Sequence, residues 1–320
     1  MTTTHFVRAG LACLLLSAPL SSFALMPTNP VSDREFTRLP SGKDLREISV
    51  NGSRLSLSKG TGSSFTAKNQ AAYLQLKEAS KNTPGHPVQW AFMDLDAGRV
   101  LEESLESNRK IFGASTSKIF VGATLLDKQE GSLNSSQLQL MANMIVVSSN
   151  TAWTNLQSQI GNGNANTGRS LVHQFTQGMG YDRMRGFQGY WGNLHGNELT
   201  AAETVRFLHD TYKGLYPGAE TLWKLMHTCR TGGSRGRKYI PTSIYVGGKT
   251  GTFDGSTIDP ETGSSKHPNG KPYTVRIRNH AMVFHVNGRQ YGLVVLADSG
   301  SDESAALLAG GLLREYGQIP

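Results

Sequence analysis

Cysteine and long apolar runs are scarce in this sequence, and their scarcity excludes several kinds of protein. Only two cysteines, Cys13 and Cys229, occur among the 320 residues, so a disulfide-dense scaffold is excluded. The nine histidines show no HxHxD or HExxH spacing, which argues against a zinc enzyme. The apolar run over residues 9–20 is too short to cross a bilayer. Packing of an ordinary apolar core must therefore supply the stability of the chain.

The first 24 residues have the features of a secretory signal peptide. Arg8 precedes the apolar run, and Ser22-Phe23-Ala24 suits cleavage after a small residue. Lipid attachment at Cys13 is the less favoured alternative, because this cysteine lies inside the run rather than after it. We therefore expect a periplasmic or secreted protein with no integral membrane segment after cleavage. Cys229 would then be its only thiol.

The charge of the chain is low in density and basic in sign. Lys and Arg number 32 against 24 Asp and Glu, which gives a formal net charge of +8. Such a charge favours anionic surroundings, for example cell-wall polymers or membrane surfaces. The basic cluster of Arg230, Arg235, Arg237 and Lys238 is interpreted as a solvated loop, and no nucleic-acid partner is expected.

The N-terminal third of the chain predicts an extension, a helix and a hairpin. Residues 26–64 are rich in Pro, Gly, Ser and Asn and predict an extension with a single hairpin. Helical spacing follows over residues 67–80. Two short strands within residues 88–105 then turn at Asp96-Ala97-Gly98.

The rest of the chain predicts helices followed by strands. Helical spacing runs through residues 116–128, 136–144, 151–160, 170–179 and 200–212. Strands are predicted at 243–246, 281–286 and 291–297, with Asn287-Gly288 as a hairpin turn, before a last helix at 303–316. We therefore expect an α+β fold: one antiparallel sheet flanked by helices, with an all-helical subdomain inserted.

A serine and a lysine one helical turn apart form the first chemical motif, Ser115-Thr116-Ser117-Lys118. Their side chains share one face of the predicted helix start. A partly desolvated lysine has a lowered pKa and can take the proton of a serine hydroxyl, which is otherwise a poor nucleophile. Alone, the motif is equally compatible with an N-cap serine and an exposed lysine.

Two further motifs follow in a specific order: Ser148-Ser149-Asn150 at a helix boundary, and Lys249-Thr250-Gly251-Thr252 at the predicted end of a strand. With them the chain resembles the penicillin-recognising serine enzymes, which include class A β-lactamases and D-alanyl-D-alanine peptidases. The resemblance covers residues 67–320. It implies a catalytic domain over 67–320, with its helical subdomain at about 115–236, after a signal peptide at 1–24 and an N-terminal extension at 25–66.

The resemblance implies four catalytic residues. Ser115 would be the nucleophile and Lys118 its base. Ser148 would relay a proton between the lysine and the leaving nitrogen, and Lys249 would place positive charge near a substrate carboxylate.

Four further residues are implied to bind substrate. Asn150 would hold the amide side chain of the substrate, and the hydroxyls of Thr250 and Thr252 would donate hydrogen bonds. Gly251 would allow close approach of two backbones. The N–H groups of Ser115 and Thr252 would form the oxyanion hole.

The sequence departs from the class A pattern where those enzymes carry a glutamate that activates water, with an asparagine four residues later. The corresponding stretch, MRGFQGYWGNLHGNELTAAE, has no such pair. Glu198 is interpreted as a helix-terminus acid, because Thr200 and Glu203 form a capping box just after it. This absence argues against fast β-lactam hydrolysis. In the same stretch, Tyr190 and Trp191 either contact substrate or pack the loop down.

Several other features have simpler interpretations. A long polar loop predicted over residues 253–274 is a second departure from the class A pattern, and it would lie on the rim of the site. The GxSxG pattern at residues 232–236 lacks the strand before it and the helix after it that α/β-hydrolases need. Met141, Met144 and Trp153 have the spacing of core residues, and His280 and His285 are interpreted as sheet residues, the first near the site.

The sequence thus predicts a secreted serine hydrolase that forms an acyl-enzyme on a β-lactam or a related amide. Its layout is class A-like, but the missing glutamate keeps a D-alanyl-D-alanine peptidase or penicillin-binding protein, acting on peptidoglycan peptides, as the alternative. A binding protein of the same fold without turnover is a third possibility. The proposed chemistry requires no metal and no organic cofactor.

Overall fold

A computed structural model describes residues 33–187, 196–256, 264–266, 269–272 and 274–320. The predicted signal peptide at 1–24 and the first part of the predicted extension lie outside these residues. Within them, no helix is both long enough and apolar enough to cross a membrane.

The centre of the molecule is a five-stranded sheet in which every neighbouring pair is antiparallel. Its order is β4 (Arg99–Glu103), β3 (Val88–Asp94), β9 (Arg289–Ala297), β8 (Thr274–Val286) and β7 (Tyr245–Ser256). The predicted α+β class is thereby confirmed. Because β3 pairs with β9, the sheet joins segments from opposite ends of the chain.

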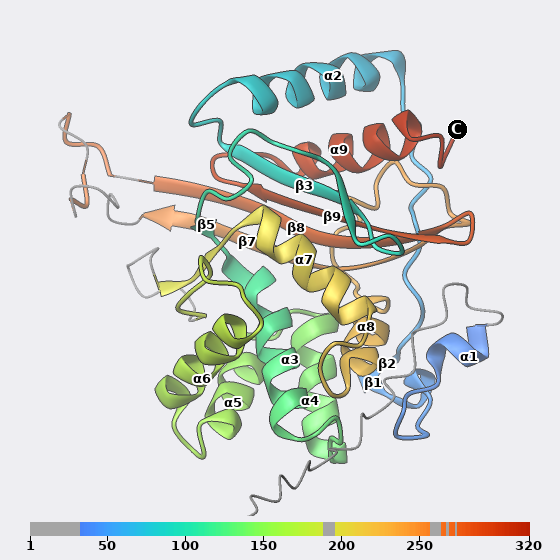
Figure 1. Cartoon of the computed structure of the whole chain (residues 1–320), viewed down its shortest axis with the longest axis vertical. Helices are drawn as coiled ribbons and strands as arrows, with labels where there is room; N and C mark the ends of the chain where they lie inside the picture. The colour runs from blue at the N-terminus through green and yellow to red at the C-terminus, as the bar shows by residue number, and fades with distance from the viewer. Residues whose placement is uncertain (1–32, 188–195, 257–263, 267–268, 273) are drawn as a thin grey trace, which may run out of the picture.

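Helices α2 (Ala67–Asn82) and α9 (Asp302–Glu315) cover one face of the sheet (Figure 1). They pack closely because α9 presents small residues to its partner. A Cβ atom on Gly311 would lie 2.2 Å from Cγ of Tyr73, whose ring is fully buried. Only glycine fits at this contact.

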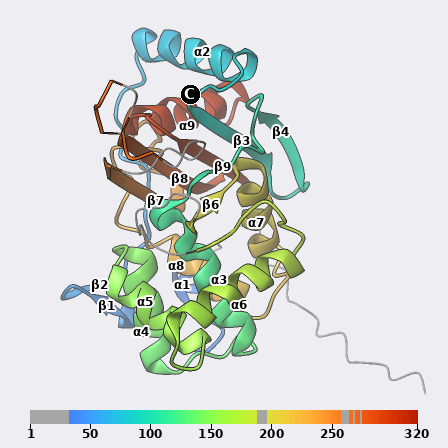
Figure 2. The ribbon, with the colours of Figure 1, turned by 90° about the vertical axis from the view of Figure 1, so that its left-hand side faces the viewer.

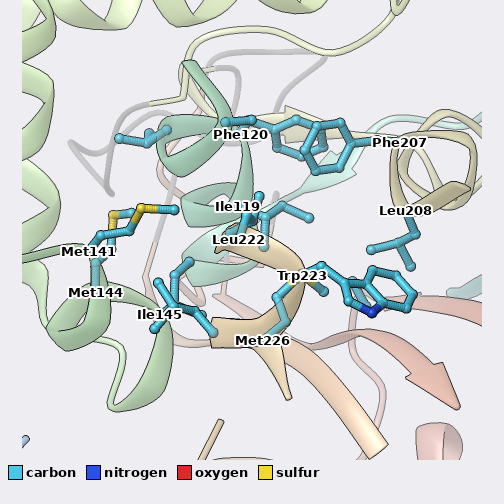
Figure 3. Close-up of a cluster of buried hydrophobic side chains, with 14 of the residues drawn as sticks. Ile119, Phe120, Met141, Met144, Ile145, Phe207, Leu208, Leu222, Trp223 and Met226 are labelled. Atoms are coloured by element: carbon cyan, nitrogen blue, oxygen red, sulfur yellow. The ribbon is translucent and has the colours of Figure 1, made fainter. Parts of the chain in front are cut away.

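The opposite face carries a helical layer of α3 (Lys118–Lys128), α4 (Ser135–Val146), α5 (Asn150–Ile160), α6 (Ala165–Gly178), α7 (Ala201–Tyr212) and α8 (Ala219–Met226). Helix α3 lies in the middle of this layer, as two perpendicular views show (Figures 1 and 2). Its residues from Lys118 to Leu126 are all buried, which explains why its sequence is apolar on every side. Figure 3 shows Ile119 and Phe120 of α3 among side chains from α4, α7 and α8.

The structure corrects the predicted secondary structure in the helical layer and in the strands that follow it. Helix α8 was not predicted, because its single short apolar stripe follows Pro217-Gly218 and is defined by packing. The polar loop predicted over 253–274 was too long. Strand β7 continues to Ser256, and β8 begins at Thr274, with Asp254 opposite Arg276 and ion-paired to Arg278 at 2.7 Å. The Lys249–Thr252 motif therefore lies inside a strand and not at its end.

The N-terminal extension packs against the helical layer. It contains α1 (Asp33–Thr37), a 3-10 turn at Leu45–Glu47, and the predicted hairpin, formed by β1 (Ser49–Val50) and β2 (Ser53–Arg54). Positive φ angles at Asn51 and Gly52 close the hairpin turn. Apolar side chains along the extension are buried in the same core as the helices: Phe36, Leu39, Leu45, Ile48, Val50 and Leu55.

Candidate active site

Ser115 lies in a 3-10 turn, Ala114–Ser117, that leads directly into α3. The residue before it, Ala114, has φ +46°, a left-handed conformation that costs free energy for any residue with a Cβ atom. The turn follows the short strand β5 (Ile111–Phe112), which pairs with β6 (Glu198–Leu199). Such a conformation persists only where the surrounding structure holds it.

Two fully buried asparagine side chains hold this turn from opposite sides. Asn197 donates from Nδ2 to the carbonyl of Ala114 at 3.0 Å, and its Oδ1 accepts a bond from the hydroxyl of Ser117. Asn279, on β8, donates to the carbonyls of Phe112 and Gly113 at 2.8 and 3.2 Å. These bonds fix the backbone that presents Ser115.

The amine of Lys118 lies beside the hydroxyl of Ser115. Its Nζ is 3.2 Å from Oγ of Ser115, and it donates to the carbonyl of Ser148 at 2.6 Å and to Oδ1 of Asn150 at 2.7 Å. The side chain is fully buried, and burial, with the nearby positive charge of Lys249, lowers its pKa from 10.5 to about 6. At neutral pH the amine is therefore largely uncharged and able to accept a proton.

Ser148 connects the two lysines of the site. It lies between α4 and α5 with φ +63°, so that its side chain turns toward the sheet. Its Oγ accepts a hydrogen bond from Lys249 at 2.8 Å and lies 3.3 Å from Nζ of Lys118. The predicted helix boundary is confirmed, because Ser149 caps α5 by accepting a bond from the N–H of Ala152.

The Lys249–Thr252 segment of β7 forms the sheet side of the site. A Cβ atom on Gly251 would lie 2.5 Å from Oγ1 of Thr116, so glycine is needed where the strand meets the serine turn. Burial lowers the pKa of Lys249 to about 8, which keeps it mostly protonated at neutral pH. Thr250 donates from its hydroxyl to that of Thr231 at 2.7 Å.

Arg235 joins this group of cations, although the sequence placed it in a solvated loop. It is 5% exposed, and its guanidinium donates to the hydroxyl of Thr252 at 2.6 Å and to the carbonyl of Gly251 at 3.0 Å. Asp302 pairs with its Nε at 2.7 Å. The interpretation as a surface loop was wrong for Arg235, because a folded guanidinium can be buried wherever carbonyls and a carboxylate surround it.

A pocket of about 320 Å³ opens beside Ser115. Three aromatic rings line it, those of Phe112, Trp153 and Phe253, and the first and last meet edge to face at 5.6 Å. Trp153 is buried like a core residue, as predicted, but it also lines the pocket and lies 5.0 Å from Nζ of Lys118. Other lining residues are Ala114, Asn150, Thr154, Gln157, Arg169 and Thr252.

Glu198 was assigned to a helix terminus, and the structure corrects that assignment. It lies in strand β6, and its carboxylate is ion-paired with Arg185 at 2.5 Å and lies 3.9 Å from Nζ of Lys110. Thr200 caps α7 as predicted. The carboxylate of Glu203 accepts hydrogen bonds from the N–H of Arg183, so the predicted capping box between Thr200 and Glu203 is not completed. None of the described residues that line the pocket has a carboxylate. Tyr190 and Trp191 lie outside the described residues.

Histidine and cysteine contribute no metal centre to the part of the chain that the structure describes, where no group of three His, Cys, Asp or Glu side chains converges. His280 is fully buried opposite Thr250 on the neighbouring strand, as its interpretation as a sheet residue near the site implied. Burial lowers its pKa well below 6.5, so the ring is neutral.

The structure thus brings the predicted site residues together. The sequence analysis did not identify their partners Asn197, Asn279 and Arg235 as part of the site.

Comparison with known proteins agrees with this fold. A family model described as the beta-lactamase enzyme family matches residues 122–312. No curated protein is similar enough to match. Among solved structures, a beta-lactamase from Streptosporangium roseum is 19% identical with a TM-score of 0.59, and the match covers 79% of this chain and 100% of that one. A representative of class A beta-lactamase from Bacteroides cellulosilyticus is 20% identical with a TM-score of 0.54, over 76% and 93% of the two chains.

At these identities the structures show the fold alone, and the family is shown by the match over most of the chain. The matched residues contain Ser148, Asn150 and the Lys249–Thr252 segment, whose geometry is described above. The chain belongs to the beta-lactamase enzyme family, within the penicillin-recognising serine enzymes, and is a beta-lactamase-like serine hydrolase.

Proposed function

We propose that Ser115 attacks the carbonyl carbon of a β-lactam, or of a related amide, and forms an acyl-enzyme. The observation that carries this proposal is the buried amine of Lys118, with its pKa of about 6, at 3.2 Å from the Ser115 hydroxyl. An uncharged amine in this place accepts the serine proton as the bond from Oγ to carbon forms. The N–H groups of Ser115 and Thr252 would stabilise the oxyanion.

The leaving nitrogen needs a proton when its bond to the carbonyl carbon breaks. Ser148 is suited to deliver it, since its Oγ lies 3.3 Å from the Lys118 amine and 2.8 Å from Lys249. The proton taken from Ser115 would pass from Lys118 to Ser148 as Ser148 gives its own to the nitrogen. Lys249 orients the Ser148 hydroxyl for this transfer.

The substrate that fits best carries a carboxylate on the leaving-group side. Lys249 and Arg235 place two buried cations along β7, and Thr250 and Thr252 present hydroxyls there. Buried cations of this kind favour an anionic group over a neutral one. Asn150 would bind the amide on the acyl side, where the aromatic pocket lies.

Turnover after acylation is proposed to be slow. None of the described lining residues has a carboxylate, and Glu198, the candidate water activator, is held in an ion pair with Arg185. An acyl-enzyme without a positioned base for water persists. This favours a class A-like enzyme with poor hydrolysis, or the alternative D-alanyl-D-alanine peptidase acting on peptidoglycan peptides, over a fast β-lactamase. The predicted signal peptide at 1–24 supports a periplasmic or secreted location.

Labelling with a fluorescent penicillin tests the proposal. Wild-type protein is expected to carry a covalent label that survives denaturing electrophoresis, and Ser115→Ala is expected to carry none. Hydrolysis of a chromogenic cephalosporin, measured in parallel, gives the turnover rate. A wild type that binds penicillin reversibly but is never labelled would instead indicate the third possibility, a binding protein without chemistry.

A further inference from the structure

An irregular segment connects helix α8 to strand β7, and we call its first part, residues 227–240, the site loop. It supplies two residues to the site: Thr231, which accepts the hydrogen bond of Thr250, and Arg235, which bonds to Gly251 and Thr252. Few of its backbone carbonyls bond within the loop. Buried carbonyls need donors from elsewhere, and the position of the loop depends on where those donors lie.

The donors come from the N-terminal extension. Residues 49–63, which we call the brace, run from the β1–β2 hairpin past the site loop toward the start of α2, along the light-blue path of Figure 1. Four backbone N–H groups of the brace donate to carbonyls of the site loop at 2.6–3.0 Å: Ser58 to His227, Thr61 to Arg237, Gly62 to Ile240 and Ser63 to Lys238. The hydroxyl of Ser58 adds a bond to the carbonyl of Cys229 at 2.6 Å.

Two arginines of the site loop bind the brace in return. Arg230 donates to the carbonyls of Val50 and Ser53 at 2.8 and 2.9 Å, and Arg237 donates from Nε to the carbonyl of Lys59 at 2.8 Å. Two more members of the basic cluster, Arg230 and Arg237, thus have backbone partners in the brace. The two segments are therefore joined at both ends of the site loop, at residues 227–230 and 237–240, on either side of Arg235.

The contact between the brace and the segment that follows α8 leaves no space for a side chain at Gly60. A Cβ atom on Gly60 would lie 2.1 Å from the carbonyl oxygen of Ile240 and 2.4 Å from that of Pro241. These are backbone atoms, so an added methyl group must move one segment away from the other. The brace also lies outside residues 122–312, the range of the family match.

We propose that the brace is a positioning element for the proposed acylation: it holds the site loop where Arg235 and Thr231 face β7, and so sets the affinity for the substrate carboxylate. This inference rests on the proposed function. It differs from a role in folding alone, because loosening the brace is expected to weaken recognition of the carboxylate while leaving Ser115 and Lys118 reactive. Neither Ser115 nor Lys118 contacts the site loop through a hydrogen bond in the part of the chain described.

The test uses full-length Gly60→Ala, with Gly178→Ala as the matched control. Gly178 ends α6, and a Cβ atom added there meets nothing within 4 Å. Each protein is reacted with a penicillin, which has a carboxylate, and with a small fluorophosphonate, which labels activated serines and has none. Arg230→Met, which removes the bonds to the β1–β2 hairpin, is the second variant should Gly60→Ala fold poorly.

Gly60→Ala is expected to lower the second-order rate constant for acylation by the penicillin by about tenfold, through weaker binding, and to leave fluorophosphonate labelling within about twofold of wild type. Hydrogen exchange is expected to speed up at residues 229–238 and to stay unchanged in β8 and β9. Gly178→Ala should match wild type in every assay.

Two results would overturn the proposal: equal losses with both reagents, or an unchanged penicillin rate in a variant whose site loop exchanges faster. If wild type reacts with the fluorophosphonate but never with a penicillin, the proposed β-lactam chemistry fails. The positioning role would then be decided by hydrogen exchange, and an unchanged site loop in both brace variants would reject it.

Discussion

Replacement of Lys118 by methionine should remove acylation and, at the same time, change how the stability of the protein depends on pH. Methionine fills a similar volume without a charge. The folded-state pKa of Lys118 is lowered from 10.5 to about 6 by burial and by Lys249. Between these two values the unfolded chain binds a proton at this lysine and the folded chain does not. Wild type therefore loses stability as the pH falls through this window, and the variant lacks that loss.

The size of this pH dependence follows from the one proton that Lys118 binds in the unfolded chain and not in the folded chain. The free energy of unfolding of Lys118→Met minus that of wild type should grow by about 1.4 kcal/mol for each pH unit lowered within the window, or about 3 kcal/mol between pH 9 and pH 7. Methionine also forfeits the hydrogen bonds to the carbonyl of Ser148 and to Asn150. That cost does not depend on pH, so it cancels when the two pH values are compared.

Urea unfolding of both proteins at pH 7, 8 and 9 measures this difference directly. Lys128→Met controls for the loss of a lysine in general, because Lys128 is an exposed residue at the other end of α3. A difference between Lys118→Met and wild type that is the same at all three pH values would mean that Lys118 stays protonated in the folded state. The amine could then not serve as the base for Ser115, and the reasoning would be refuted.

Three further predictions follow from the site. The rate of acylation by a penicillin should rise as the pH increases through 6, where Lys118 loses its proton, and should fall above about pH 8, where Lys249 loses the charge that binds the carboxylate. A stopped-flow assay measures this rate, and a rate that does not change from pH 5 to pH 9 would contradict both assignments. Asn197→Ala should cost about 2 kcal/mol in urea unfolding and slow acylation, because it frees the turn around the nucleophile; normal acylation in a destabilised variant would limit Asn197 to a structural role. Gly251→Ala should slow acylation by about a hundredfold with a smaller change in KM, since its Cβ atom would displace Thr116; unchanged kinetics would show that the strand and turn can separate without loss.

The chemical motifs were predictable because each is local in the sequence. Ser115 and Lys118 are one helical turn apart. Asn150 begins a helix and Ser148 lies just before the cap of that helix, so periodicity and capping indicate where these side chains lie. The sheet class was predictable for the same reason, since the Asn287-Gly288 turn and the alternating strands are short-range signals.

The supporting residues were not predictable, since their partners are distant in the chain. Asn279 binds carbonyls more than 160 positions earlier, and nothing around Asn279 in the sequence indicates that its amide is buried. Arg235 was misread because a basic cluster resembles a solvated loop until the carbonyls that surround it are known. The same holds for Gly60, whose necessity comes from the backbone of residues 240 and 241.

The central claim, that Ser115 forms a long-lived acyl-enzyme, is tested most directly by intact-mass spectrometry of the protein mixed with a penicillin and followed from minutes to hours. We predict one added penicillin mass per chain in wild type, absent in Ser115→Ala, that persists over this time. Rapid loss of the drug with only a transient adduct would contradict slow turnover and direct attention to Glu198 as the water activator. An adduct that survives in Ser115→Ala, or none in wild type, would contradict the assignment of the nucleophile itself.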